Sequence, residues 1–346
     1  MEEIIRIGMD TSKQVFQLHG VDAQERVVLR RRLRRREVVG FFAKLSPTQV
    51  GIEACGGAHH WARELSALGH EVKLLPAQYV KAYVKRGKND AADAEALCEA
   101  MSRPTMSFVA PKSAEAQAAL MLAGVREQLI RSRVRLANAI RGHAAEFGLV
   151  TPKGQARIVP LLARAQGDER LPGLARRLFG ELAEQYAALE ARLAVLDAEL
   201  MAWHRQNETS RRLAQIPGVG PVSASLLVMK APDAQAFRSG RDFAAWLGLT
   251  PKDHSTAGKQ KLGVITRAGD EMLRSLLVVG ATAVIWQARC GRGRPSPWLV
   301  ELLRRKPPKL AAVALANKTA RIAWKLMVSG ESYRAGHRPP ALPAAV

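Results

Sequence analysis

The sequence predicts an α/β domain followed by mainly helical regions. Three short apolar segments come first, and each has the length and composition of a strand: IIRIGMD (4–10), VFQLHGV (15–21) and RVVLRRRL (26–33). Helical and strand-like segments then alternate as far as residue 103. Beyond that residue, apolar residues recur at the spacing of a helix. Three strands followed by alternating helices and strands are typical of a mixed sheet covered by helices.

The remaining elements of the first domain follow in order. We expect a short helix at 37–45, a buried strand at QVGIEA (49–54) and a helix at HWARELSALGH (60–70) that ends at Gly69. A strand at EVKLL (71–75) precedes two further helices, at 77–84 and at 90–101. The first domain therefore spans residues 1–103.

Two long helices are predicted in the middle of the chain, at 114–147 and after residue 178. Apolar residues of the second helix are spaced alternately by four and three positions: Leu182, Tyr186, Leu189, Leu193, Leu196, Leu200 and Trp203. This heptad fits either a hairpin within one chain or a coiled coil between subunits. We therefore divide the chain into 1–103, a helical or coiled-coil region at 104–210, a mainly helical domain at 211–330 and a disordered tail at 331–346.

Composition restricts the partners of the protein. The formal net charge is +22, which indicates a polyanionic partner such as DNA or RNA. A membrane partner is disfavoured, because the longest apolar run, at 276–286, is well short of the roughly 18 residues of a span. The N-terminus shows no signal-peptide pattern, and the three cysteines lack metal-site spacing. We expect a cytoplasmic protein.

Four acidic residues stand where strands end or a helix begins. Asp10 and Glu53 end two strands, and Asp90 and Asp93 share one face of the next helix. Such a group would repel unless a hard cation, Mg²⁺ or Mn²⁺, lay between its members. Alternatively, Asp90 and Asp93 only favour the helix dipole behind an Asn89 cap. The order of acids fits the ribonuclease-H-like fold, and the basic loop Lys85, Arg86 and Lys88 lies where a phosphate would bind.

Two further motifs occur in the C-terminal domain. IPGVGP (216–221) has the pattern of a helix-hairpin-helix, in which Gly218 and Gly220 bring backbone amides to a phosphate; an ordinary turn is the alternative. Ser255 lies in a small polar loop, upstream of four cations: Lys259, Lys261, Arg267 and Arg274. A serine among cations can attack a phosphodiester, with His254 as a possible proton acceptor. The alternative is a turn serine that binds its own backbone.

Together these motifs make the chain resemble the IS110 family of insertion-sequence transposases. The segments that carry the resemblance extend from residue 4 to about residue 327: GMDTSK, GIEACGGAHHWARELSALGH, KNDAADAEAL, IPGVGP, LGLTPKDHSTAGKQKLGVITRAGDEMLR and LANKTARIAWKLM. HSTAGK (254–259) is most similar to the HSSGGK subgroup. It departs from that subgroup at Thr256 and Ala257, so Ser255 is the matching serine.

The resemblance implies a RuvC-like N-terminal domain whose metal-binding quartet is Asp10, Glu53, Asp90 and Asp93. It also implies a serine recombinase in which Ser255 forms a covalent phosphoserine with DNA. A non-coding bridge RNA would pair with donor and target DNA, and a dimer or tetramer would bring the quartet and the serine together. The protein would work at the bacterial nucleoid.

Two alternatives stay open on the sequence. A metal-dependent Holliday-junction resolvase would use water as its nucleophile, and a non-catalytic nucleic-acid-binding protein would need no metal. A sugar kinase is disfavoured by the charge and by the lack of a glycine between Asp10 and Thr11. Six arginines within residues 30–36 would bind nucleic-acid backbones with strong salt dependence, unless they are only a solvated strand edge.

Overall fold

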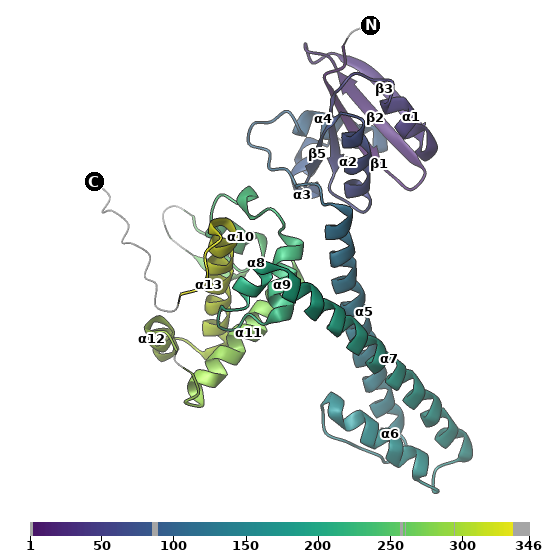
Figure 1. Cartoon of the computed structure of the whole chain (residues 1–346), viewed down its shortest axis with the longest axis vertical. Helices are drawn as coiled ribbons and strands as arrows, with labels where there is room; N and C mark the ends of the chain where they lie inside the picture. The colour runs from purple at the N-terminus through teal and green to yellow at the C-terminus, as the bar shows by residue number, and fades with distance from the viewer. Residues whose placement is uncertain (1–2, 85–88, 257–258, 260, 294, 335–346) are drawn as a thin grey trace. The chain divides into compact units, whose positions relative to one another are not determined.

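The computed structural model describes residues 3–84, 89–256, 259, 261–293 and 295–334. The chain forms two compact units, Met1–Gln117 and Ala118–Val346 (Figure 1). No helix in these described ranges is long and apolar enough to cross a membrane. The predicted basic loop Lys85, Arg86 and Lys88 and most of the predicted tail lie outside the described residues.

The first unit is built on a five-stranded sheet with the order β3-β2-β1-β4-β5. Its strands are β1 (Arg6–Thr11), β2 (Val15–Val21), β3 (Val27–Arg34), β4 (Gln49–Glu53) and β5 (Glu71–Leu75). The first three are joined antiparallel, whereas β1–β4 and β4–β5 are parallel pairs. The predicted mixed sheet is confirmed, and it is compatible with a RuvC-like domain.

Helices cover both faces of this sheet. Alternate residues of the strands, such as Ile7, Met9 and Ile52, join a buried core with α1 (Val38–Phe42) and α2 (Ala58–Ala67). The other face is covered by α4 (Asp90–Ala100), which packs on β1, β2 and β4. The short elements η1 (Arg35–Glu37), α3 (Ala77–Val80) and η2 (Lys81–Tyr83) complete this unit.

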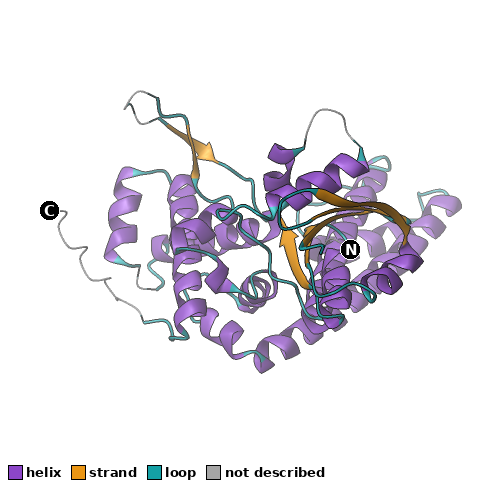
Figure 2. Cartoon of the chain, turned by 90° about the horizontal axis from the view of Figure 1, so that it is seen from above, coloured by secondary structure: helices purple, strands orange, loops and turns teal. Residues whose placement is uncertain are grey.

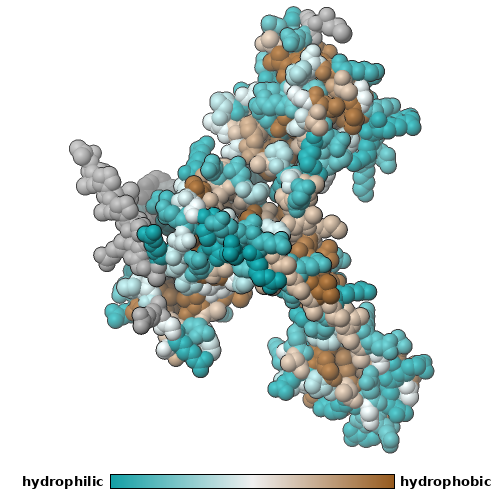
Figure 3. All heavy atoms as spheres, viewed as in Figure 1, coloured by the Kyte–Doolittle hydropathy of each residue, from teal (hydrophilic) through white to brown (hydrophobic). Residues whose placement is uncertain are grey.

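The second unit begins with two long helices that pair within the chain. These are α5 (Ala114–Ala145), whose first residues belong to the first unit, and α7 (Gly173–Gln206). Ion pairs join Arg126 to Asp197 at 2.5 Å and Arg133 to Glu190 at 2.9 Å. The helices η3 (Gln155–Arg157) and α6 (Ile158–Gly167) close the far end. In Figure 3, apolar residues gather where α5, α6 and α7 meet.

The predicted heptad lies on α7 and is only partly buried by this hairpin. Tyr186, Leu193 and Leu200 are buried, in agreement with the intrachain hairpin. The residues between them remain half-exposed: Leu182, Leu189, Leu196 and Trp203. The half-exposed members of the heptad therefore leave apolar surface on one side of the hairpin.

The rest of the second unit packs around one apolar core. Its helices are α8 (Glu208–Leu213), α9 (Pro221–Lys230), η4 (Ala234–Ala236), α10 (Gly240–Trp246), α11 (Glu271–Arg289), α12 (Pro297–Arg305) and α13 (Pro308–Ser329). Alanines of α13, including Ala316 and Ala320, are fully buried and let neighbouring helices approach closely. One hairpin, β6 (Pro251–Asp253) with β7 (Leu262–Ile265), projects from this core (Figure 2).

Candidate functional site

Asp10 and Glu53 lie side by side on the sheet face that α4 covers. Gly8 of β1 pairs with Gly51 of β4, and Met9 pairs with Ile52. Side chains alternate along a strand, so Asp10 shares the face of Gly8, and Glu53 shares the face of Gly51. Neighbouring strands are about 4.8 Å apart, which brings the two carboxylates to adjacent positions at the carboxyl ends of parallel strands.

The direction of α4 brings its first turn to the same place. The Arg6 guanidinium donates to the carbonyl of Cys98 at 2.9 Å, and Gly8 lies against the carbonyl of Ala94. From Arg6 to Gly8 the strand advances about 6.6 Å, and from Cys98 to Ala94 the helix advances about 6 Å in the same direction. The two elements are therefore antiparallel, and contacts repeat every two residues of β1 and every four residues of α4. One further step places Asp90 beside Asp10.

Two glycines make this close packing possible. A Cβ atom on Gly8 would lie 2.0 Å from the Ala94 carbonyl oxygen, and one on Gly51 would lie 2.6 Å from the Met101 sulfur. Each glycine comes two residues before an acid, in IGMD and in VGIE. The sequence prediction missed this repeated Gly-x-acid pattern, which marks where a helix lies on the sheet beside the site.

Asn89 caps α4, as predicted. Its side chain accepts a hydrogen bond from the backbone N–H of Ala92 at 2.8 Å. The cap fixes the first turn of the helix, and therefore the positions of Asp90 and Asp93. The capping explanation and the site explanation are thus compatible, because the same turn serves both.

The electrostatics of Asp10 reflect its three acidic neighbours. The pKa of Asp10 is raised to about 6, first by burial and then by three negative neighbours. Those neighbours are Asp90, Asp93 and Glu53. Within the described ranges, no three acidic, histidine or cysteine side chains are close enough to share one metal ion. Like charges hold carboxylates apart unless a cation lies between them, which accounts for this spacing.

The donor set fits a hard divalent cation. All four side chains offer carboxylate oxygens, which Mg²⁺ and Mn²⁺ prefer. Asp93 and Glu53 are half-buried and Asp90 is exposed, so the site opens to solvent on one side. A bound cation would relieve the repulsion that raises the pKa of Asp10.

Ser255 lies in the loop of the exposed β6–β7 hairpin. Its backbone N–H donates to the Asp253 carboxylate at 2.8 Å, and its Oγ accepts from the N–H of Lys261 at 3.0 Å. The hydroxyl also hydrogen-bonds Asp253, and this bond is the largest cause that lowers the pKa of that carboxyl group. The hydroxyl is exposed and held in one orientation, partly by its own loop, as the turn alternative predicts.

The residue beside the serine hydroxyl is Asp253 and not His254. The His254 ring lies against Gly263 of β7, where an added Cβ would be 3.3 Å from its Cδ2 atom. The interpretation of His254 as proton acceptor therefore has no support in this loop. Sequence reasoning missed Asp253, although an aspartate two residues before a serine is a common turn pattern.

The four cations predicted around the serine differ in their surroundings. Lys259 and Lys261 are exposed in the same loop, and Arg267 is exposed just beyond β7. Arg274 instead donates to the carbonyls of Leu247 and Gly269 at 3.2 and 3.0 Å. One nitrogen of its guanidinium, Nη1, is thus engaged within the fold, and a contact of Arg274 with nucleic acid stays a prediction.

The glycines of IPGVGP also differ. Gly218 has a φ of 84° and packs against Gly280 of α11, so its missing side chain is explained by helix packing. Gly220 is exposed at the start of α9 with open space around it. A phosphate contact by this turn stays a prediction. Gly220 is a better candidate for that contact than Gly218, because it is exposed.

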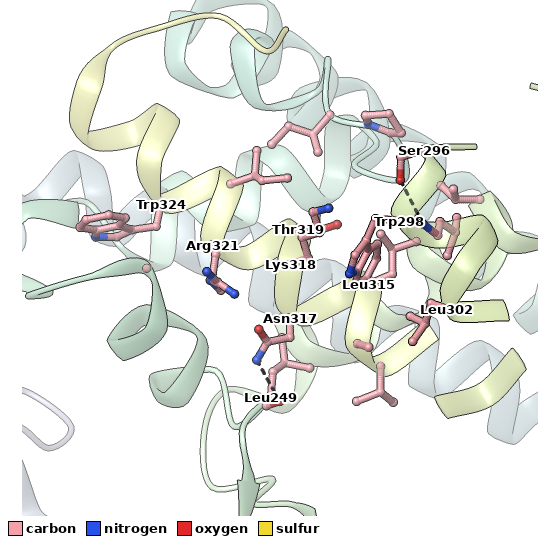
Figure 4. Close-up of a pocket in the computed structure, with 18 of the residues that line it drawn as sticks. Leu249, Ser296, Trp298, Leu302, Leu315, Asn317, Lys318, Thr319, Arg321 and Trp324 are labelled. Carbon is pink, nitrogen blue, oxygen red and sulfur yellow. Dashed lines mark hydrogen bonds between the residues drawn. The ribbon is translucent and has the colours of Figure 1, made fainter. Parts of the chain in front are cut away.

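A hollow of about 2500 Å³ lies next to the serine hairpin within the second unit. Residues of β7, including Val264, form part of its wall. Trp298 of α12 and Lys318 of α13 both line it and contact each other, with the Lys318 Nζ 4.1 Å from the ring centre (Figure 4). Further cations line the hollow: Arg241, Arg267, Lys306, Arg321 and Lys325. The sequence did not predict it, because its wall combines residues far apart in the chain.

Comparison with known proteins identifies the family. A model of DEDD transposases of the IS110 type, described as "Transposase", matches residues 7–147. A second model, "Transposase IS116/IS110/IS902 family", matches residues 210–294. The chain belongs to the IS110 family of transposases. The protein is therefore an insertion-sequence transposase, an enzyme that cuts and rejoins DNA, and a non-catalytic binding protein is set aside.

Relatives along nearly the whole chain agree with this assignment. The chain is 67% identical to "Putative transposase y4pF/y4sB" of Sinorhizobium fredii, over 96% of this chain and 87% of that protein. It is 49% identical to "Probable family 20 transposase" of Pseudomonas aeruginosa, over 96% and 99%. It is 39% identical to "Transposase for insertion sequence element IS1328" of Yersinia enterocolitica, over 95% and 98%. The DEDD domain suggests dependence on a divalent metal ion.

Proposed function

We propose that this transposase cuts and exchanges DNA strands with two groups of residues. The quartet of Asp10, Glu53, Asp90 and Asp93 holds the metal, and Ser255 is the nucleophile. The observation that carries the proposal is the grouping of the quartet at one sheet face, where burial first and then the other three carboxylates raise the pKa of Asp10 to about 6. This is an arrangement that a structural role alone does not explain.

The quartet's part is to bind and orient. Carboxylates on β1, β4 and α4 come from three rigid elements, so their relative positions are fixed by packing of the fold. Mg²⁺ or Mn²⁺, when bound, would orient the DNA phosphate and stabilise the negative charge that develops on it. The exposed side of the site gives a DNA strand access to Asp90.

The serine's part is to form the covalent link. The Ser255 oxygen attacks the phosphorus and gives its proton to solvent, the new O–P bond replaces the bond to the leaving DNA oxygen, and that oxygen takes up a proton from solvent. Asp253 orients the hydroxyl; with its lowered pKa it is a poor base, so we assign it a positioning role. The phosphoserine link retains the bond energy, so strands are rejoined without ATP.

Basic surfaces near the serine support a nucleic-acid path through the second unit. Lys259 and Lys261 flank the loop, and the hollow beside β7 presents cations next to Trp298. A phosphate backbone fits this charge. Gly220 would add a backbone amide contact at the start of α9.

A guide RNA and self-association complete the proposal. The net charge of +22 fits a bridge RNA bound together with donor and target DNA. The half-exposed heptad residues of α7 fit a dimer or tetramer. RNA that co-purifies with the protein, once sequenced, tests the guide directly: sequences from the element's non-coding ends support it, and random cellular RNA contradicts it.

The serine chemistry is tested with DNA that carries a nick near the cleavage point. Wild-type protein should form a protein–DNA adduct that survives denaturation, and Ser255→Ala should form none. Thr256→Val is the matched control, and it should retain the adduct. A junction resolvase that uses water would instead release cut DNA with free ends and no adduct from either protein.

A further inference from the structure

The outer strand of the sheet carries an unusual density of arginines. β3 reads VVLRRRLR and holds four arginines without an acidic residue. It has one neighbour, β2, so its other edge is open. Arg30, Arg32 and Arg34 are all exposed.

Strand register places Arg30, Arg32 and Arg34 on the same sheet face as the carboxylates. Asp10 pairs with Gln17 of β2, and Gln17 pairs with Arg32 of β3. Directly opposed residues project to the same face, so Asp10, Gln17 and Arg32 form one row across the sheet. Two strand spacings of about 4.8 Å put the Cα of Arg32 about 10 Å from that of Asp10.

Two more arginines extend this row along the strand. Arg30 pairs with His19, which pairs with Gly8, and Arg34 pairs with Val15. Alternate strand residues are about 6.8 Å apart, so three guanidinium groups form a line beside Asp10. We call Arg30, Arg32 and Arg34 the arginine track.

Two other arginines of this run, Arg31 and Arg35, face the opposite way. Arg31 pairs with Leu18, whose side chain belongs to the core beneath α1 and α2, and its guanidinium lies over the Phe41 ring at 5.1 Å. Arg35 lies over the Trp61 ring at 5.0 Å. These two are on the face away from the carboxylates, and they provide a comparison with equal charge.

We infer that the arginine track binds the phosphate backbone of the DNA strand that the carboxylates act on. This inference rests on the proposed function, because the occupant of the track is the strand held at the quartet. A row of cations on one sheet face, continuous with the site, holds a line of phosphates and fixes the position of the strand that enters. The contact is to the backbone and carries no sequence preference.

A second explanation of charged edge strands makes a different prediction. Charge on an open edge prevents strand pairing between molecules, and arginines on either face would serve that purpose equally. Only a phosphate track requires that the arginines of one face matter and those of the other do not. Because side chains alternate along β3, arginines on the opposite face serve as the control.

The experiment compares two full-length variants with equal loss of charge. The track variant is Arg30→Gln and Arg32→Gln, and the control variant is Arg31→Gln and Arg35→Gln. Binding of a short labelled DNA duplex is measured in EDTA over a range of NaCl concentrations. Loss of two phosphate contacts should reduce the slope of log K against log salt by about 1.8, while the control slope stays near wild type. Melting temperatures of both variants confirm folding.

Each outcome has one meaning. Weaker DNA binding by the track variant alone supports the track, and equal behaviour of both variants overturns it. Loss of binding to an RNA duplex with DNA binding unchanged also overturns it, because the occupant would then be RNA. Adduct formation by the wild-type protein is measured separately: its absence contradicts the proposed function and leaves the binding comparison readable.

Discussion

The carboxylate site and the serine loop are held in place in different ways. Asp10 and Glu53 stand on buried strands, and α4 is fixed against them by contacts that leave no room for a Cβ atom on Gly8. Ser255 stands on a hairpin whose β6 residues are all exposed, and hydrogen bonds within the loop orient it. The first site is built by the core of its unit, and the second is built by one turn.

The side chains of the two sites are therefore positioned by different means. Packing positions the carboxylates before any ligand arrives, and the cost is a raised pKa at Asp10. The serine hairpin exposes apolar side chains, with Leu262 53% and Val264 69% exposed. Exposed apolar residues beside a basic hollow mark a surface that a partner covers. We therefore expect the carboxylate site to be sensitive to core changes and the serine loop to be tolerant of them.

The largest effect is expected from the helical carboxylates. Asp90→Asn and Asp93→Asn each remove charge from the metal-binding set without changing side-chain shape, so we expect recombination to fall by about 100-fold or more. A plasmid recombination assay measures this, and circular dichroism checks the fold. Recombination at wild-type levels by both variants would contradict the metal assignment.

Gly8→Ala should be the most destabilising single change in the first unit. Its Cβ would meet backbone atoms of α4, which cannot move without lifting the helix, so we expect a loss of about 3 kcal/mol of unfolding free energy. Urea unfolding measures it. Gly40→Ala in α1 meets open space and should be neutral or slightly stabilising.

The same substitution in the serine hairpin sharpens the comparison. Gly263→Ala meets the His254 ring, which can rotate away, and the Lys252 Cβ at an ordinary contact distance of 3.7 Å, so we expect a loss of less than about 1 kcal/mol. If Gly263→Ala proves as destabilising as Gly8→Ala, the hairpin is held more firmly than its exposure indicates.

Asp10→Asn should stabilise the metal-free protein at neutral pH. The folded-state pKa of about 6 is above the ordinary value of 3.8, so the folded protein holds this proton more tightly than the unfolded chain. The favourable contribution of protonated Asp10 is complete below pH 3.8 and is lost as the pH rises through about 6. After allowance for solvent screening at this half-buried group, we expect Asn to add on the order of 1 kcal/mol at neutral pH.

Melting curves in EDTA at neutral and acid pH measure this effect. The gain should vanish at pH 4, where Asp10 is protonated in the wild type. Added Mn²⁺ should raise the melting temperature of the wild type more than that of Asp10→Asn. An equal rise in both proteins would place the cation elsewhere.

The smallest effect is expected from Asp253. Asp253→Asn keeps an oxygen that accepts the Ser255 N–H, whereas Asp253→Ala removes it and frees the hydroxyl. We expect Ala to lower the adduct-forming rate by about tenfold and Asn by less, with DNA affinity unchanged in both. Single-turnover kinetics separate rate from affinity. Equal rates for all three proteins would show that the turn does not orient the serine.

The sequence predicted the carboxylate site better than its surroundings. The acids could be found because strands alternate and Asp-x-x-Asp shares one helix face, and these are local rules. The contact of Gly8 with Ala94 joins residues far apart in sequence, so the reason for the glycines was missed. Strand alternation was also not applied to the arginine run, although it separates Arg32 from Arg31.

The serine loop shows the limit of local reasoning. Residue types predicted a polar turn with cations, but not which side chains face the hydroxyl, so the contact with Asp253 was missed. Proton acceptance by His254 and a nucleic-acid contact by Arg274 stay predictions, although one nitrogen of Arg274 is engaged with two carbonyls. The hollow at Trp298 and Lys318 depends on helix packing that no short motif encodes.

Mass spectrometry of the trapped protein–DNA adduct tests the central claim most directly. Nicked DNA is incubated with wild-type protein and Mg²⁺, the adduct is digested, and the peptide that carries the nucleotide is sequenced. The account predicts a phosphodiester on Ser255, formed in Mg²⁺ and absent with Asp10→Asn. A nucleotide on another residue, or cut DNA without any linked peptide, would contradict it.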